Sequence, residues 1–82
     1  MDIHHLDPKN DVYLREVKDI RSKLEHTPQV IFDLGGNVGG FSLRLAQYFP
    51  DAHVHTFEPV KVTFEKLNET VKDLKNVTTY NF

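Results

Sequence analysis

Residues 30–40 read VIFDLGGNVGG, and this stretch decides the fold. Its first five residues are apolar apart from one aspartate and show no alternation, which predicts a strand covered on both faces, as in parallel sheets. All four glycines of the chain lie within the next six positions. Glycine adopts backbone angles that other residues avoid, and it lets a ligand approach the main chain closely. The stretch therefore predicts a buried strand that turns sharply into a helix through a binding loop.

Helix and strand patterns alternate on both sides of this loop. Apolar residues three and four positions apart predict helices over residues 11–25, 40–49 and 60–74, the first capped by Asn10 or Asp11. Short apolar or alternating runs predict strands over residues 30–34, 54–57 and 77–82. This order favours right-handed crossovers and strand order 3-2-1. The predicted fold is α/β, the first half only of a Rossmann-like three-layer parallel sheet.

The domain organisation follows from this pattern. Residues 1–27 form an N-terminal segment and helix, and residues 28–82 form the N-terminal half of a Rossmann-like domain that binds a cofactor. The apolar stripe of the first helix is expected to cover the sheet of its own chain. That stripe contains Tyr13, Val17, Ile20 and Leu24.

Composition narrows the function classes. A chain of 82 residues with 39% hydrophobic and 27% charged residues is one small globular domain. The absence of cysteine excludes a disulfide scaffold, thiol catalysis and cysteine-bound zinc. The formal charge of −2, without a basic run, disfavours nucleic acid as a partner. No apolar run is long enough for a membrane span and no signal peptide is visible, so a cytoplasmic location is expected.

The glycine loop fits some nucleotide motifs poorly. In a dinucleotide fingerprint, Asn37 would occupy the central glycine, where the pyrophosphate comes closest to the backbone. In a P-loop, Phe41 would stand in place of the essential lysine. Asp33 directly before the loop would repel a pyrophosphate and suits a cationic ligand instead. A turn whose glycines serve only packing remains the simplest alternative.

Two motifs together resemble a known family. The pattern Asp33-x-Gly35-x-Asn37-x-Gly39 is similar to the first motif of class I S-adenosylmethionine-dependent methyltransferases. It most resembles the FkbM type, in which the loop reads D-x-G-A-N-x-G and the second strand ends in F-E-P, as in Phe57-Glu58-Pro59 here. Gly36 departs from the alanine that is usual in that family. The resemblance covers residues 28–82.

The resemblance implies S-adenosylmethionine as the cofactor. The implied cofactor-binding residues are Asp33, Gly35, Gly36, Asn37, Gly39 and Glu58. Glu58 follows the second strand, where a carboxylate accepts hydrogen bonds from ribose hydroxyls, and Val60 would contact the ribose or adenine. The implied partner is a small-molecule methyl acceptor. The methyl group would be transferred to a hydroxyl of a small molecule or sugar. No catalytic base is assigned, and the chain, as half of a catalytic domain, is expected to be inactive alone.

The histidines do not indicate a metal site. His53 and His55 are predicted to share one face of a strand, which brings two imidazoles together. No third ligand is placed with them by the sequence. We therefore expect no bound metal and assign these histidines to packing or to the solvent-facing surface.

The first strand is expected to be an edge of the sheet. Val30, Ile31 and Phe32 would then present unpaired backbone groups beside exposed apolar side chains, which promotes association. We therefore expect either a truncated piece of a larger enzyme or a homodimer that forms through this edge.

Two other function classes stay open at this stage. A fragment of a dinucleotide-dependent oxidoreductase would share the strand, the loop and the acidic residue. A non-catalytic interaction module would need neither Glu58 nor the loop to touch a ligand. Replacing Glu58 by alanine separates the module from the cofactor-binding classes, because only the latter predict a change in ligand affinity.

Overall fold

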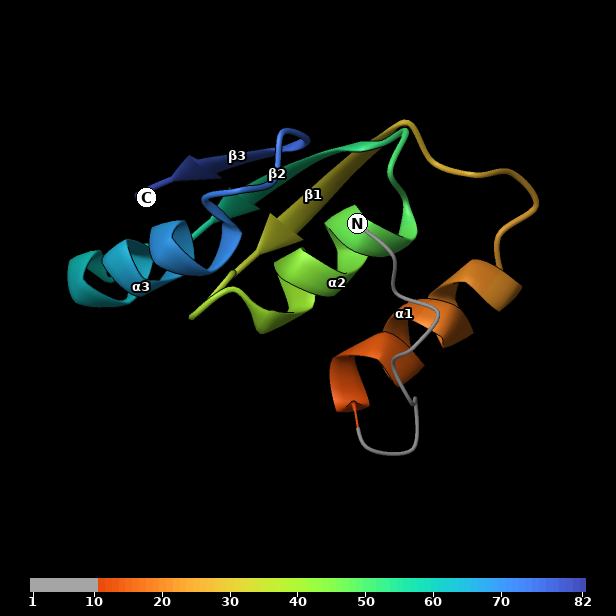
Figure 1. Cartoon of the computed structure of the whole chain (residues 1–82), viewed down its shortest axis with the longest axis horizontal. Helices are drawn as coiled ribbons and strands as arrows, with labels where there is room; N and C mark the ends of the chain where they lie inside the picture. Colours follow the sequence, from red (N-terminus) through yellow and green to blue (C-terminus); the bar gives the residue numbers. More distant parts are fainter. Residues whose placement is uncertain (1–10) are drawn as a thin grey trace.

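Helices and strands alternate along the chain in the predicted order. The computed structural model describes residues 11–82, so the first ten residues of the predicted N-terminal segment, with the cap candidate Asn10, lie outside them. The elements are α1 (Val12–Ser22), β1 (Val30–Leu34), α2 (Gly40–Tyr48), β2 (His53–Phe57), α3 (Lys61–Val71) and β3 (Val77–Tyr80) (Figure 1). Asp11 is the N-cap of α1, as one of the two predicted candidates, and its side chain accepts the Leu14 N–H.

The three strands form one parallel sheet. β2 lies in the middle, with β1 and β3 at the two sides, so the neighbours are those of the predicted order 3-2-1. The register aligns Phe32 with His55, and His55 with Thr78. Because side chains alternate between the faces of a sheet, these three residues project on the same face.

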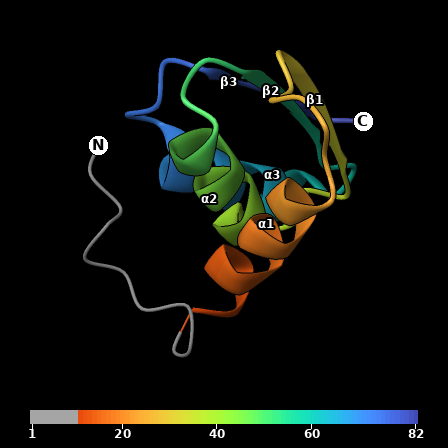
Figure 2. The same cartoon turned by 90° about the vertical axis from the view of Figure 1, so that its right-hand side faces the viewer.

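All three helices lie on the other face of the sheet (Figure 2). The β1–β2 and β2–β3 connections step in the same direction across the sheet, so crossovers of one handedness bring α2 and α3 to the same side. The main core lies between this helix layer and the sheet. It is formed by Val17, Leu45, Ala46, Phe49, Ala52 and Val54.

The prediction that β1 is covered on both faces is wrong for the described residues. Ile31 and Asp33 face the helices and are half-buried, whereas Val30, Phe32 and Leu34 are exposed. The reason is that no helix of residues 11–82 packs on that side (Figure 2). We call this surface the open face. Its side chains are Val30, Phe32 and Leu34 of β1, His53, His55 and Phe57 of β2, Thr78 and Tyr80 of β3, and Phe82.

Helix α1 also differs from its prediction. It packs chiefly against α2, not on the sheet, and it ends at Ser22. Leu14 and Val17 are buried in this contact, while Ile20 and Leu24 of the predicted stripe each remain 38% exposed. Tyr13, also of that stripe, is 40% exposed. Because α1 contacts α2 more than it contacts the sheet, only part of its apolar stripe is covered.

Candidate functional site

The glycine loop follows β1 and closes onto the end of β2. The N–H groups of Gly35 and Gly36 both donate to the carbonyl oxygen of Phe57, at 2.9 and 2.8 Å. Gly35 and Gly39 adopt left-handed φ angles of 77° and 96°. Asn37, at φ 52°, is the one non-glycine residue of the described chain with positive φ. Asparagine tolerates this region better than most residues, as predicted for this position.

The space around each glycine shows whether tight packing or an open backbone is found at that position. A Cβ atom at Gly36 would lie 2.3 Å from Thr56 Oγ1, and one at Gly40 would lie 2.6 Å from the ring of Tyr13. A Cβ atom at Gly35 would meet nothing within 4 Å. Packing therefore explains part of the glycine cluster, whereas Gly35 presents its backbone to open space, as a ligand-binding loop requires.

Glu58 lies directly beneath this loop. Its Oε1 accepts the Asn37 N–H and its Oε2 accepts the Val60 N–H, both at 2.9 Å. The residue is only 7% exposed, while Val60 beside it is 53% exposed. A carboxylate has about four acceptor positions, and these two bonds use one on each oxygen. Each oxygen therefore keeps capacity to accept a hydroxyl from a ligand.

Asp33 is held by a hydroxyl network inside the protein. Ser42 Oγ donates to Asp33 Oδ2 at 2.5 Å, which is short for a hydrogen bond. Thr56 Oγ1 lies 2.9 Å from Ser42 Oγ and 3.4 Å from Asp33 Oδ2. Since the single Ser42 proton goes to Asp33, Thr56 donates to Ser42 or to the carboxylate. The network fixes the Asp33 carboxylate at the start of the loop.

The structure brings the predicted site residues together at the carboxyl ends of β1 and β2. Glu58 contacts Asn37 directly, Gly35 and Gly36 bond the strand that precedes Glu58, and Asp33 reaches the same strand through Thr56. Gly39 begins α2 as its N-cap.

Sequence reasoning missed two residues of this site, Ser42 and Thr56, which are both fully buried. Alternation in the second strand could have found one of them, because Val54, Thr56 and Glu58 share a face. Ser42 carries no such signal, since its role depends on how α2 lies over the end of β1.

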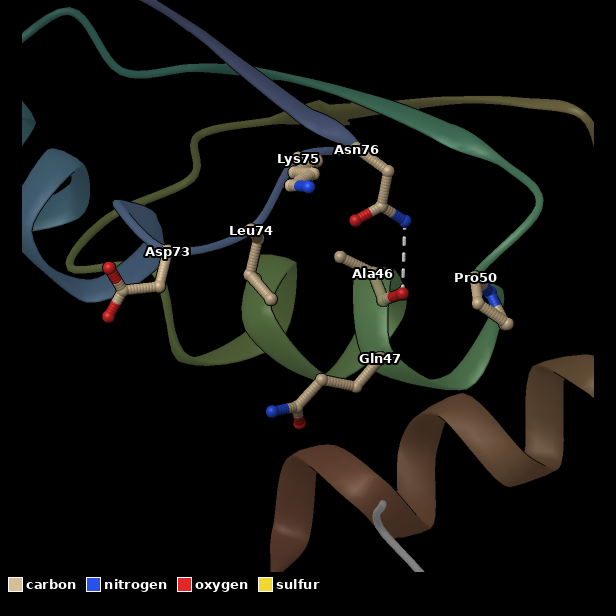
Figure 3. Close-up of a pocket in the computed structure, with 7 residues that line it drawn as sticks. All are labelled: Ala46, Gln47, Pro50, Asp73, Leu74, Lys75 and Asn76. Atoms are coloured by element: carbon tan, nitrogen blue, oxygen red, sulfur yellow. Dashed lines mark hydrogen bonds between the residues drawn. The ribbon is translucent and has the colours of Figure 1, made fainter. Parts of the chain in front are cut away.

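A groove of about 310 Å³ lies at the opposite end of the sheet (Figure 3). It is lined by the end of α2 and by the connection from α3 to β3. The Asn76 amide in it donates to the carbonyl oxygens of Ala46 and Ala52, both at 3.0 Å, and to that of Phe49 at 3.4 Å. Asn76 thus joins β3 to the end of α2.

We place the candidate site at the glycine loop, where side-chain acceptors and open backbone converge.

The two strand histidines lie side by side on the open face. Their ring centroids are 4.8 Å apart. His53 Nε2 lies 2.6 Å from Thr78 Oγ1, and His55 Nδ1 lies 2.9 Å from the Tyr80 hydroxyl. Within residues 11–82 there is no group of three or more side chains suited to holding a metal ion. The histidines thus take part in a network across the strands.

Comparison with known proteins gives structural matches only. No family model and no curated protein match the chain. A solved structure described as a putative S-adenosyl-L-methionine-dependent methyltransferase from Methanococcus maripaludis matches 92% of the chain, with 17% identity and a TM-score of 0.80. Coclaurine N-methyltransferase, solved with N-methylheliamine and SAH, matches 96% of the chain, with 18% identity and a TM-score of 0.73. TYW2 from M. jannaschii, solved with AdoMet, matches 95%, with 21% identity and a TM-score of 0.67.

These matches show the fold, which is the first half of the Rossmann-like methyltransferase fold. The chain spans 36%, 24% and 35% of the lengths of these three proteins. A separate observation concerns membranes: no helix within residues 11–82 is both long and apolar enough to cross a lipid bilayer.

Proposed function

We propose that this chain binds S-adenosylmethionine at the glycine loop and supplies the cofactor-binding half of a methyltransferase of the FkbM type. The observation that carries the proposal is the position of Glu58, a buried carboxylate that contacts the loop residue Asn37 while each of its oxygens keeps acceptor capacity. The structural neighbours solved with AdoMet or SAH support the same ligand class.

The residues present fit this cofactor. Glu58 would accept the ribose hydroxyls, and the exposed side chain of Val60 beside it offers an apolar surface to the ribose or adenine. Gly35 offers open backbone, and the carboxylate of Asp33 favours the cationic end of the ligand. When bound, the cofactor supplies an electrophilic methyl group on its sulfonium, so catalysis depends mainly on holding an acceptor in line.

One departure from the family pattern has a local cause. The loop has Gly36 where alanine is usual in the family it resembles, and Thr56 Oγ1 occupies the space that an alanine Cβ would need. The change leaves Asp33, Gly35, Asn37 and Gly39 in place. We propose a hydroxyl of a small molecule or sugar as the acceptor and assign no catalytic base within this chain.

Isothermal titration of the chain with S-adenosylhomocysteine tests the proposal, and a separate titration with NAD is the control. We expect binding of S-adenosylhomocysteine and none of NAD. Glu58→Gln should weaken binding by on the order of tenfold or more, because an amide replaces a charged acceptor of two hydroxyls.

The matched control is Glu69→Gln, the same change on the exposed surface of α3, which should leave the affinity unchanged. Because Glu58 also holds two backbone N–H groups, thermal unfolding of each variant separates loss of affinity from loss of folding. Preferential binding of NAD, or equal affinity in wild type and a folded Glu58→Gln variant, contradicts the proposal.

A further inference from the structure

The protein holds the Asp33 carboxylate through one of its two oxygens. Ser42 Oγ and Thr56 Oγ1 both approach Oδ2, at 2.5 and 3.4 Å. Within residues 11–82 no donor bonds to Oδ1, and no buried side-chain oxygen or nitrogen in that range lacks a partner. Oδ1 is therefore accessible to solvent, and a ligand can approach it.

The charge of Asp33 is not neutralised by a cation of the described chain. None of the ion pairs within residues 11–82 includes Asp33, and residues 33–43 contain neither Lys nor Arg. Arg44, the next cation along the chain, is paired with Asp11 at 2.8 Å. A half-buried carboxylate without a counter-ion favours a cationic group of a ligand over a neutral or anionic one.

Asp33 does not serve the loop as a cap for its backbone. Within the described chain its hydrogen bonds are to side-chain hydroxyls. The first three N–H groups of the loop donate instead to the carbonyl oxygen of Phe57 and to the carboxylate of Glu58. The loop backbone therefore has its partners without Asp33, and the shape of the loop does not explain the free oxygen.

Two buried hydroxyls fix the orientation of this carboxylate. The register of β1 and β2 aligns Asp33 with Thr56, and Ser42 lies in the first turn of α2. The 2.9 Å contact between Thr56 and Ser42 is shorter than the contact between Thr56 and Asp33. This geometry favours a chain in which Thr56 donates to Ser42 and Ser42 donates to Asp33. Both hydroxyl residues are fully buried, so water does not compete for these bonds.

We propose that Ser42 and Thr56 are positioning residues of the binding site, which present the free oxygen of Asp33 to the ammonium group at the amino-acid end of the ligand. This inference rests on the proposed function, because S-adenosylmethionine carries such a group. Glu58 would hold the adenosine end through the ribose, so the two carboxylates bind opposite ends of one molecule. The two hydroxyls thereby determine how strongly the site prefers a ligand that carries the ammonium group.

Isothermal titration with two ligands tests this inference. S-adenosylhomocysteine carries the amino-acid end, whereas 5′-methylthioadenosine has the same adenosine and thioether without the ammonium group. Ser42→Ala should weaken binding of S-adenosylhomocysteine by on the order of tenfold and change the affinity for 5′-methylthioadenosine by less than about twofold. Glu58→Gln should weaken the binding of both ligands, because both carry the ribose.

Further variants separate the loss of a hydroxyl from other changes. Thr56→Val removes the hydroxyl with little change in shape and should act in the same way as Ser42→Ala. Thr56→Ser keeps the hydroxyl and should restore most of the affinity that Thr56→Val loses. Ser22→Ala, the matched change at the exposed end of α1, should leave both affinities unchanged. Thermal unfolding of each variant shows whether it is folded.

Asp33→Asn shows whether the hydroxyls act through the carboxylate. It should lower the preference for S-adenosylhomocysteine, and adding Ser42→Ala should lower that preference little further. Equal effects of a folded Ser42→Ala variant on the two ligands, or an effect that persists in full beside Asp33→Asn, overturns this inference alone. A wild type that binds neither ligand contradicts the proposed function and this inference together.

Discussion

The contact between Gly36 and Thr56 shapes the loop at the scale of single residues. Thr56 is fully buried and its hydroxyl completes the network that holds Asp33. The same hydroxyl fills the space beside Gly36, so the loop residue and the strand residue depend on each other.

Gly36→Ala should lower the free energy of unfolding by about 1–3 kcal/mol through overpacking against Thr56. Thr56→Ala removes the obstructing oxygen, so the double variant should lose less stability than the sum of the two single changes. Urea denaturation of all four proteins measures this coupling.

Gly35→Ala is the matched control for this cycle. Its Cβ meets no atom within 4 Å, but its φ of 77° strains any side chain, at a cost of roughly 1–2 kcal/mol. Thr56→Ala should not relieve that strain. Strictly additive losses for Gly36→Ala and Thr56→Ala would show that the steric contact is not the cause.

Asp11 joins two elements, because it caps α1 and reaches α2. Its Oδ1 accepts the Leu14 N–H at 2.9 Å, and its Oδ2 accepts Arg44 Nε at 2.8 Å. The Leu14 N–H, with the Arg44 guanidinium, holds the pKa of Asp11 below its ordinary value of 3.8. The ionised form therefore stabilises the fold.

The contribution of Asp11 to stability should depend on pH. Because its folded-state pKa lies below the unfolded value, the contribution is present above about pH 4 and is lost as the pH falls through the folded-state pKa. Asp11→Ala should lower the free energy of unfolding by about 1 kcal/mol at neutral pH. Denaturation curves from pH 2 to pH 7, with steps of about one unit, measure both effects.

Asp11→Asn is the informative comparison. Asparagine still caps a helix but has no titrating group, so this variant should lose less stability between pH 4 and pH 2 than the wild type does. Parallel loss in the two proteins would show that other carboxyl groups cause the acid sensitivity.

For the whole molecule, the order of the elements and the strand neighbours could be predicted from the sequence. The reason is that hydrophobic spacing and the cluster of glycines are local signals. The position of Glu58 beside the glycine loop could also be predicted, since the carboxyl ends of adjacent parallel strands lie at the same end of a sheet.

What could not be predicted depends on the arrangement of layers. The apolar β1 sequence suits a strand covered on both faces, but the connections between the strands bring α2 and α3 to one side, where α1 also lies. The alignment of Ser42 with Asp33 likewise depends on how α2 crosses the end of β1. Both features depend on tertiary packing, which produces no periodic pattern in the sequence.

The two backbone contacts of Glu58 have a consequence for how this protein evolves. Its carboxylate holds the backbone of Asn37 and of Val60, so losing it destabilises the loop whether or not a ligand is ever bound. Selection for a folded domain is therefore enough to keep this glutamate, whatever the loop binds. The left-handed backbone at Gly35 likewise favours glycine for the sake of the fold alone, because its φ of 77° strains any side chain. Retention of Glu58 or Gly35 in a relative is therefore evidence for the shape of this loop and not, by itself, for a ligand.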